Sequence, residues 1–175
     1  MPLRDRLTAA VTRALRAPLE SIVRERVAEE VERRITEEKL DALYRHRMHG
    51  DPAKLRIHDT AIVNNALFNV SGGTITIGEH AFFGHDVAIL TGTHDIEQFG
   101  RARQLAFPRS GRDVVIGEGV WLASHVLVLG PVTIGAHAVV AGGSLVREDV
   151  EPYTVVAGRP AKVVKRLTPP TESTA

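Results

Sequence analysis

Cysteine is absent from the 175 residues of the sequence. This absence excludes disulfide bridges, thiolate metal sites and a covalent cysteine intermediate. Long hydrophobic runs are absent too: the longest, such as Val126–Leu129, have four residues, whereas a membrane-spanning helix needs ~18. An excess of one charge sign is also missing. The net charge is +1, so no global electrostatic field predicts binding to nucleic acid.

The start of the chain lacks the features of a signal peptide, because Met1–Arg6 contain a proline and charged residues instead of an apolar stretch. Apolar residues make up 43% and charged residues 25% of the chain, as is ordinary for a soluble globular protein. We therefore expect a cytoplasmic protein with one domain and an appendage.

Glycine does not occur before Gly50, and residues 1 to about 50 are predicted to be helical. Pro18 fits the first turn of a second helix, and a last short helix is expected over about 36–48. The apolar spacing favours an ordinary packing or oligomerisation helix. Residues 1–17 carry four arginines against one aspartate, so a membrane-surface helix is the alternative. The apolar residues recur every three or four positions, at Leu3, Leu7, Val11, Leu15, Leu19, Ile22, Val23, Val27, Val31 and Ile35.

A six-residue repeat organises the chain after residue 55. The first residue of each repeat is aliphatic and the fifth is small or β-branched. Six consecutive repeats begin at Ile116, Leu122, Val128, Ile134, Val140 and Val146. The same frame fits upstream from Ile77, Phe83 and Ile89, and more weakly from Ile57 and Val63. It slips by two residues near Val70–Gly73.

Each hexad predicts a short strand followed by a corner, and three hexads would close one coil of a triangular prism. Ile116 should then stack on Ile134, Leu122 on Val140, and Val128 on Val146. We therefore predict a parallel β-helix over about 57–157. The expected organisation is a helical extension over 1–50, a β-helix domain over 51–167 and a loose tail over 168–175.

The pattern resembles the hexapeptide-repeat acyltransferases, and most closely their sugar O-acetyltransferase branch, which includes maltose and galactoside acetyltransferases. The resemblance covers roughly residues 57–167. It rests on TITIG (74–78), ILTGTHD (89–95), IGEGVWLASHVLVLGPVTIG (116–135), VVAGGSLVREDV (139–150) and VVAGRPAKVV (155–164). It implies an all-β, left-handed parallel β-helix, a homotrimer with sites between neighbouring prisms, acetyl-CoA as co-substrate, no metal, and a small-molecule or glycan acceptor.

The repeat is interrupted once, because Ile89 and Ile116 are 27 residues apart. The sequence predicts a loop insertion at about 93–113 with His94 at its root, where Asp95 and Glu97 could orient the imidazole. An imidazole exchanges a proton near neutral pH, which suits a general base. A G-x-S-x-G elbow is lacking, which favours direct attack by the acceptor hydroxyl. The resemblance implies that His94 is this base.

Further site residues follow from the resemblance. It implies that the backbone N–H of Ser124 binds the oxyanion and the coenzyme, that Trp121 lines the groove, and that an asparagine among Asn64, Asn65 and Asn69 binds the acceptor. Glycines suit the slender pantetheine arm and cations suit the phosphates. The expected coenzyme-binding residues are Gly142, Gly143, Arg147, Arg159, Lys162 and Lys165. The family often has Thr-Lys where this chain has Arg147–Glu148.

Three alternatives remain open. A serine acetyltransferase also places helices before its prism, but its active histidine follows an aspartate, whereas His94 precedes Asp95. A zinc protein similar to the γ-class carbonic anhydrases would need a histidine where Leu90 stands, five residues after His85. A non-catalytic structural prism would be expected to lack both His94 and the insertion. His80, His125 and His137 occupy fourth hexad positions and are expected at exposed corners.

Overall fold

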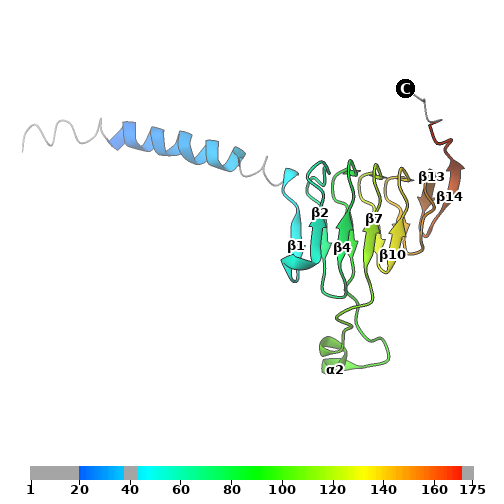
Figure 1. Cartoon of the computed structure of the whole chain (residues 1–175). Helices are drawn as coiled ribbons and strands as arrows, with labels where there is room; N and C mark the ends of the chain where they lie inside the picture. Colours follow the sequence, from blue (N-terminus) through cyan, green and yellow to red (C-terminus); the bar gives the residue numbers. More distant parts are fainter. Residues whose placement is uncertain (1–19, 38–42, 171–175) are drawn as a thin grey trace, which may run out of the picture. The chain divides into compact units, whose positions relative to one another are not determined.

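The computed structural model describes residues 20–37 and 43–170, and the chain divides into two units, Met1–Ala42 and Leu43–Ala175 (Figure 1). In the first unit, residues 20–37 form an α-helix. Its apolar side chains remain between 46 and 58% exposed and form a stripe of Ile22, Val23, Val27, Val31 and Ile35. The helix expected within residues 1–17, on which the membrane-surface alternative depends, lies outside the described residues.

The second unit is a prism of three sheets, which we call sheets A, B and C. The chain visits them in the order A, B, C along each coil, and every strand pair is parallel except β13 with β14. This is the predicted all-β, left-handed parallel β-helix after a helical extension. Sheet A contains β1 (Arg47–His49), β3 (Leu67–Asn69), β6 (Ala88–Leu90), β9 (Leu127–Leu129) and β12 (Leu145–Val146).

The other two faces follow the same rule. Sheet B contains β2 (Leu55–Ile57), β4 (Ile75–Ile77), β7 (Val114–Ile116) and β10 (Val132–Ile134), which lie side by side in Figure 1. Sheet C contains β5 (Phe82–Phe83), β8 (Trp121–Leu122), β11 (Val139–Val140), β13 (Thr154–Gly158) and β14 (Ala161–Arg166).

The strand register confirms the predicted stacking. Ile134 pairs with Ile116, Val140 with Leu122, and Val146 with Val128. Stacking of the first residue of each hexad fills the prism with aliphatic side chains, and those of the middle coils are almost fully buried. The outward positions differ between faces: those of sheet A are largely leucines, whereas those of sheet B include Arg56, Thr76, Val115 and Thr133.

The corners explain the polar residues of the hexads. His80, His125 and His137 have positive φ values of 54°, 61° and 58°, and each lies in a turn. The left-handed conformation at these positions bends the chain between two faces, and it confirms that these histidines occupy corners. His80 and His125 are exposed, whereas His137 is half-buried and packs on Tyr153, with ring centroids 4.9 Å apart.

The helix expected over about 36–48 is wrong at its C-terminal end, because Arg47–His49 form strand β1. Met48 pairs with Phe68 and covers the first full coil. A 3-10 turn, η1 (Pro52–Lys54), follows, with Asp51 accepting a hydrogen bond from the Ala53 N–H. The prism therefore begins at β1 rather than after Gly50.

The insertion leaves the prism after β6 and returns at β7 (Figure 1). It contains a short helix, α2 (Gly100–Leu105). Its two ends rest on Gly72 and Gly73: a Cβ on Gly72 would lie 2.3 Å from the Thr91 oxygen, and one on Gly73 would lie 2.6 Å from the Arg112 carbonyl carbon. The two-residue slip in the hexad frame therefore forms the seat of the insertion.

Residues 168–170 extend beyond β14 without regular structure, and the rest of the expected tail lies outside the described residues. Among the residues that the structure describes, no helix has both the length and the apolar character needed to cross a membrane.

Candidate active site

His94 lies at the root of the insertion, and its imidazole is fixed by one hydrogen bond. Its Nδ1 is 2.8 Å from the Arg103 carbonyl oxygen. A carbonyl can only accept, so Nδ1 carries the proton and Nε2 of the neutral ring presents a lone pair. The Phe107 ring packs edge-on against the imidazole, with centroids 6.0 Å apart. The arrangement leaves Nε2 able to accept a proton.

The partner of His94 differs from the one predicted. Asp95 Oδ1 instead accepts a hydrogen bond from the Glu97 N–H at 3.0 Å. The Arg103 carbonyl is available because α2 ends at Leu105, and the last carbonyls of a helix lack partners within it. No sequence signal identified this carbonyl, since a backbone group in an irregular loop has no residue preference.

The Arg103 side chain secures the same loop. Its Nε donates to the Gln98 carbonyl at 2.6 Å and its guanidinium to the Ile96 carbonyl at 3.2 Å. The guanidinium also lies 5.0 Å from the centroid of the Phe99 ring. Arg103 therefore ties both sides of the insertion together while its carbonyl holds His94.

A cavity of about 240 Å³ opens beside His94, and it is lined by His49, Asn69, Ser71, Gly92, Thr93, His94 and Phe107. His49 and Asn69 are register partners on β1 and β3. The Asn69 Oδ1 accepts from the N–H and the hydroxyl of Ser71, at 2.9 and 2.6 Å, which leaves the Asn69 amide NH₂ for a ligand. Neighbouring hydroxyl, amide and imidazole groups suit a ligand rich in hydroxyls.

Asn69 is the predicted asparagine that the structure brings to His94. The Asn64 Nδ2 donates to the Phe83 carbonyl at 2.7 Å. Asn65 exchanges two hydrogen bonds with Asp86, at 2.9 and 2.8 Å. Both residues therefore stabilise the corner between sheets C and A by hydrogen bonds. His49 was not predicted, because only the pairing of β1 with β3 places it beside Asn69.

Asp113 anchors the far end of the insertion. Its Oδ1 accepts from the Thr74 N–H at 2.6 Å and from the Thr74 hydroxyl at 2.9 Å. These two hydrogen bonds, followed by the charge of Lys54, hold the pKa of Asp113 below its ordinary value. Arg112 adds a hydrogen bond from Nε to the Thr91 carbonyl at 2.8 Å. The root of the loop is thus tied down at both ends.

The predicted coenzyme residues lie mainly along a second edge, where the chain passes from sheet C to sheet A. The Gly143 N–H donates to the Ser124 carbonyl at 2.9 Å, and the Arg159 Nε donates to the Gly143 carbonyl at 2.5 Å. The Ser124 hydroxyl accepts from the His85 N–H at 3.1 Å. These contacts align Ser124, Gly143 and Arg159 in one column.

This second edge has exposed backbone that could hold a coenzyme. A Cβ added to Gly143 would meet nothing within 4 Å, and one added to Gly142 would lie 3.3 Å from the Ser124 oxygen. Side-chain-free backbone beside an exposed arginine suits a slender arm that ends in phosphates. Within the described part of the chain, the Ser124 N–H has no hydrogen-bond partner, although other corner residues share this feature.

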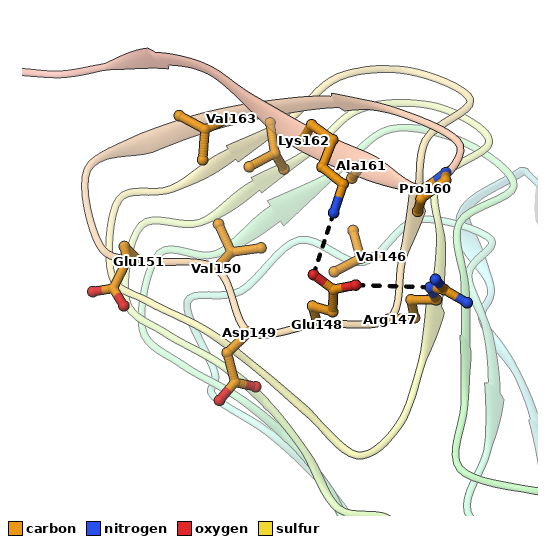
Figure 2. A pocket seen from close by; sticks show the side chains of 11 residues that line it. Val146, Arg147, Glu148, Asp149, Val150, Glu151, Pro160, Ala161, Lys162 and Val163 are labelled. Carbon is orange, nitrogen blue, oxygen red and sulfur yellow. Dashed lines mark hydrogen bonds and ion pairs between the residues drawn. The ribbon is translucent and has the colours of Figure 1, made fainter.

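Arg147 and Lys162 lie instead at the end of the prism, where they line a cavity of about 230 Å³ (Figure 2). The Lys162 Nζ is 3.4 Å and the Arg147 Nε 3.9 Å from carboxylate oxygens of Glu148. Asp149 and Glu151 line the same cavity. A phosphate here would compete with carboxylates for the two cations. Lys165 is exposed on β14, where it pairs with Val155.

Trp121 lies on the outer face of sheet C and stacks on Phe82, with ring centroids 5.7 Å apart and planes 13° apart. Both side chains remain 43% exposed. Trp121 belongs to the strand that leads into the Ser124 corner, so it lies on the Ser124 side of the prism and does not line the His94 cavity. A stacked, exposed aromatic pair is suited to cover by another molecule.

The zinc alternative has no ligand set in the described residues. Within residues 20–37 and 43–170, no three His, Asp or Glu side chains converge so that they could hold a metal ion. His85 contacts Tyr44 in an edge-on arrangement with centroids 6.2 Å apart.

Comparison with known proteins places this geometry among acetyltransferases. The family described as Bacterial transferase hexapeptide (six repeats) matches residues 113–148. Serine acetyltransferase 2 of Arabidopsis thaliana is 38% identical over 109 residues, which are 62% of this chain and 32% of that protein. The chain spans between 28 and 58% of the lengths of the first curated relatives that it matches.

Solved structures are similar as well. A hexapeptide-repeat acetyltransferase from Vibrio cholerae, complexed with acetyl coenzyme A, is 32% identical with a TM-score of 0.60, covering 70% of this chain and 69% of that one. The polysialic acid O-acetyltransferase OatWY is 26% identical with a TM-score of 0.53, covering 69% of this chain and 58% of that one.

Proposed function

The chain belongs to the hexapeptide-repeat acyltransferase family, and on this premise we propose that it transfers the acetyl group of acetyl-CoA to a hydroxyl of a sugar or glycan. The observation that carries the proposal is the fixed His94 imidazole, whose Nε2 is available beside a polar cavity with Asn69. The Vibrio cholerae relative binds acetyl coenzyme A, and OatWY acetylates a glycan by its name.

His94 is the general base of this reaction. The acceptor hydroxyl oxygen attacks the thioester carbonyl carbon, and its proton passes to Nε2 of His94. The C–S bond then breaks, the acetyl group stays on the acceptor oxygen, and the departing sulfur of coenzyme A takes the proton from Nε2 of His94. Because the Arg103 carbonyl accepts from Nδ1, the ring keeps the tautomer that this step requires. Asn69 and His49 orient the acceptor.

The donor is bound along the edge formed by Ser124, Gly142, Gly143 and Arg159. The backbone N–H of Ser124 stabilises the negative charge that develops on the thioester oxygen. Arg159 and Lys165 hold the phosphates. Lys162 and Arg147 contribute less at this edge, since Glu148 already meets both of their charges.

A homotrimer completes the site. Ser124 and His94 lie at opposite edges of sheet A, whose three-residue strands span about 10 Å. A neighbouring prism packed on sheet A would bring its own Ser124 edge toward His94. The outward leucines of sheet A offer the apolar contact that such packing needs.

The test is release of coenzyme A thiol from acetyl-CoA in the presence of a panel of sugars and glycans. His94→Gln should lower kcat by ~10²–10⁴-fold, the usual contribution of a general base. The affinity for acetyl-CoA should remain near the wild-type level, because His94 would meet the acceptor and the thioester carbon rather than the phosphates of the coenzyme.

His80→Gln is the matched control, since His80 is an exposed histidine at a corner between sheets B and C and does not line the His94 cavity. It should leave kcat unchanged. Full turnover in His94→Gln would remove the proposed base and with it the assignment of this cavity.

O-acetylation of L-serine is a second candidate function. It is favoured by the 38% identity to a serine acetyltransferase. Including L-serine in the acceptor panel separates the two: serine as the preferred acceptor would replace the sugar assignment, while His94 would keep its role.

A further inference from the structure

The cavity beside His94 differs in charge from the cavity at the end of the prism. No carboxylate lines the His94 cavity, whose polar groups come from His49, Asn69, Ser71 and Thr93. The cavity at the prism end contains the carboxylates of Glu148, Asp149 and Glu151. A negatively charged ligand would therefore be repelled at the prism end and accepted beside His94.

The segments around the His94 cavity concentrate positive charge. Residues 45–56 and the insertion over 91–113 together contain eight arginines and lysines against four aspartates and glutamates. The whole chain has a net charge of only +1. The surplus near the cavity is therefore local, and it is balanced by acidic residues elsewhere.

Two arginines of these segments neighbour residues that line the cavity. The Arg109 guanidinium lies 5.0 Å from the centroid of the Phe107 ring, which lines the cavity. Arg47 lies two residues before His49 on β1, and alternate residues of a strand face the same side. Arg47 and His49 therefore project from the same outer face. Among the described residues, no carboxylate forms an ion pair with either arginine.

We propose that the acceptor bound beside His94 is a sugar that carries an anionic group, a carboxylate or a phosphate, held by Arg47 and Arg109. The inference rests on the proposed function and adds the chemical class of the acceptor. The hydroxyls of the sugar meet Asn69 and His49, while the anionic group reaches the two arginines at the rim.

The acceptor test compares sugars that differ only at C6, where an anionic group replaces the hydroxyl of glucose. Glucuronate and glucose 6-phosphate represent the two kinds of anion, and glucose is the neutral partner. We expect kcat/KM to be about tenfold or more higher for an anionic sugar, and this preference to shrink as ionic strength rises. The carboxylate and the phosphate are ranked by the same assay.

Arginine variants test which side chains bind the anionic group of the acceptor. Arg47→Gln and Arg109→Gln should each raise KM for the anionic acceptor by about threefold to tenfold and leave KM for glucose unchanged. Arg101→Gln is the control: it removes the same charge from α2, and Arg101 does not line the cavity. It should change neither constant.

Calorimetric titration of the full chain with glucuronate and glucose separates this inference from the proposed function. Selective binding of glucuronate that is weakened by Arg109→Gln supports an anion-binding acceptor site even if no acetyl transfer occurs. Transfer to glucose and glucuronate with equal kcat/KM, insensitive to both arginine variants, overturns the inference and leaves the proposed function standing.

Discussion

Arg103 has two roles in the insertion. Its carbonyl selects the His94 tautomer, and its guanidinium binds backbone carbonyls of the loop segment that follows His94. It touches neither substrate in our proposal, so it is a positioning residue. The distinction matters because its loss should change the geometry of the base without changing the binding of acetyl-CoA.

Arg103→Ala should lower kcat about tenfold, because small displacements of a catalytic group are costly, and should leave KM for acetyl-CoA unchanged. Nitrogen-15 NMR of His94 should show a loss of the Nδ1–H tautomer. Arg101→Ala is the matched control on the same helix. A wild-type tautomer in Arg103→Ala, together with wild-type kcat, would contradict the positioning role.

Single residues also show how far the sequence could lead. His94 and Asn69 belong to motifs of a recognisable family, so the candidate site could be predicted in part. His49 and Arg103 could not, since one depends on a strand pairing and the other on a backbone carbonyl. The choice among Asn64, Asn65 and Asn69 required the register across the two-residue slip.

At the scale of elements, Gly72 and Gly73 form the platform on which the insertion is built. Both ends of the insertion contact their backbone at distances that exclude a side chain. The hexad frame revealed the two-residue slip at this point, but it did not predict that the slip contacts both ends of the insertion. β1 escaped prediction for a related reason: it has only three residues, and Met48 alone points into the core.

Gly73→Ala should lower the free energy of unfolding by about 1–3 kcal/mol, as expected for overpacking against backbone, and should also lower kcat by displacing His94. Gly111→Ala is the control within the same insertion. A Cβ at Gly111 would meet nothing within 4 Å. Only the positive φ should therefore lower the free energy of unfolding, by about 1 kcal/mol. Denaturant unfolding measures both, and equal losses would contradict a seating role for Gly73.

At the scale of the whole molecule, the three faces of the prism differ in what they can bind. Sheet A presents Leu67, Leu90, Leu127, Leu129 and Leu145, all half-buried, whereas sheet B presents mostly polar residues. Sheet C adds the stacked Phe82 and Trp121. The hexad frame predicted the stacking of the coils, because burial repeats strictly. The hexad frame did not predict the composition of the outer faces, because many residue types are tolerated at solvent-exposed positions.

The full chain should sediment as a trimer of the 19.0 kDa protomer at micromolar concentration. Leu127→Lys should weaken assembly at least tenfold, because it places a charge in an apolar interface, and it should reduce turnover together with trimer content. Thr76→Lys on sheet B is the control and should remain trimeric. A stable, fully active monomer would contradict the shared site.

The sequence separation between paired strands also affects how the chain folds. Ile116 and Ile134 pair across only 18 residues, so each coil can form on the coil before it. Contacts of short sequence separation favour fast folding. The insertion raises the separation between Ile77 and Ile116 to 39 residues. A doubling of loop length adds only about 0.6 kcal/mol of closure entropy. The length of the insertion can therefore change with little effect on the folding of the prism that carries it.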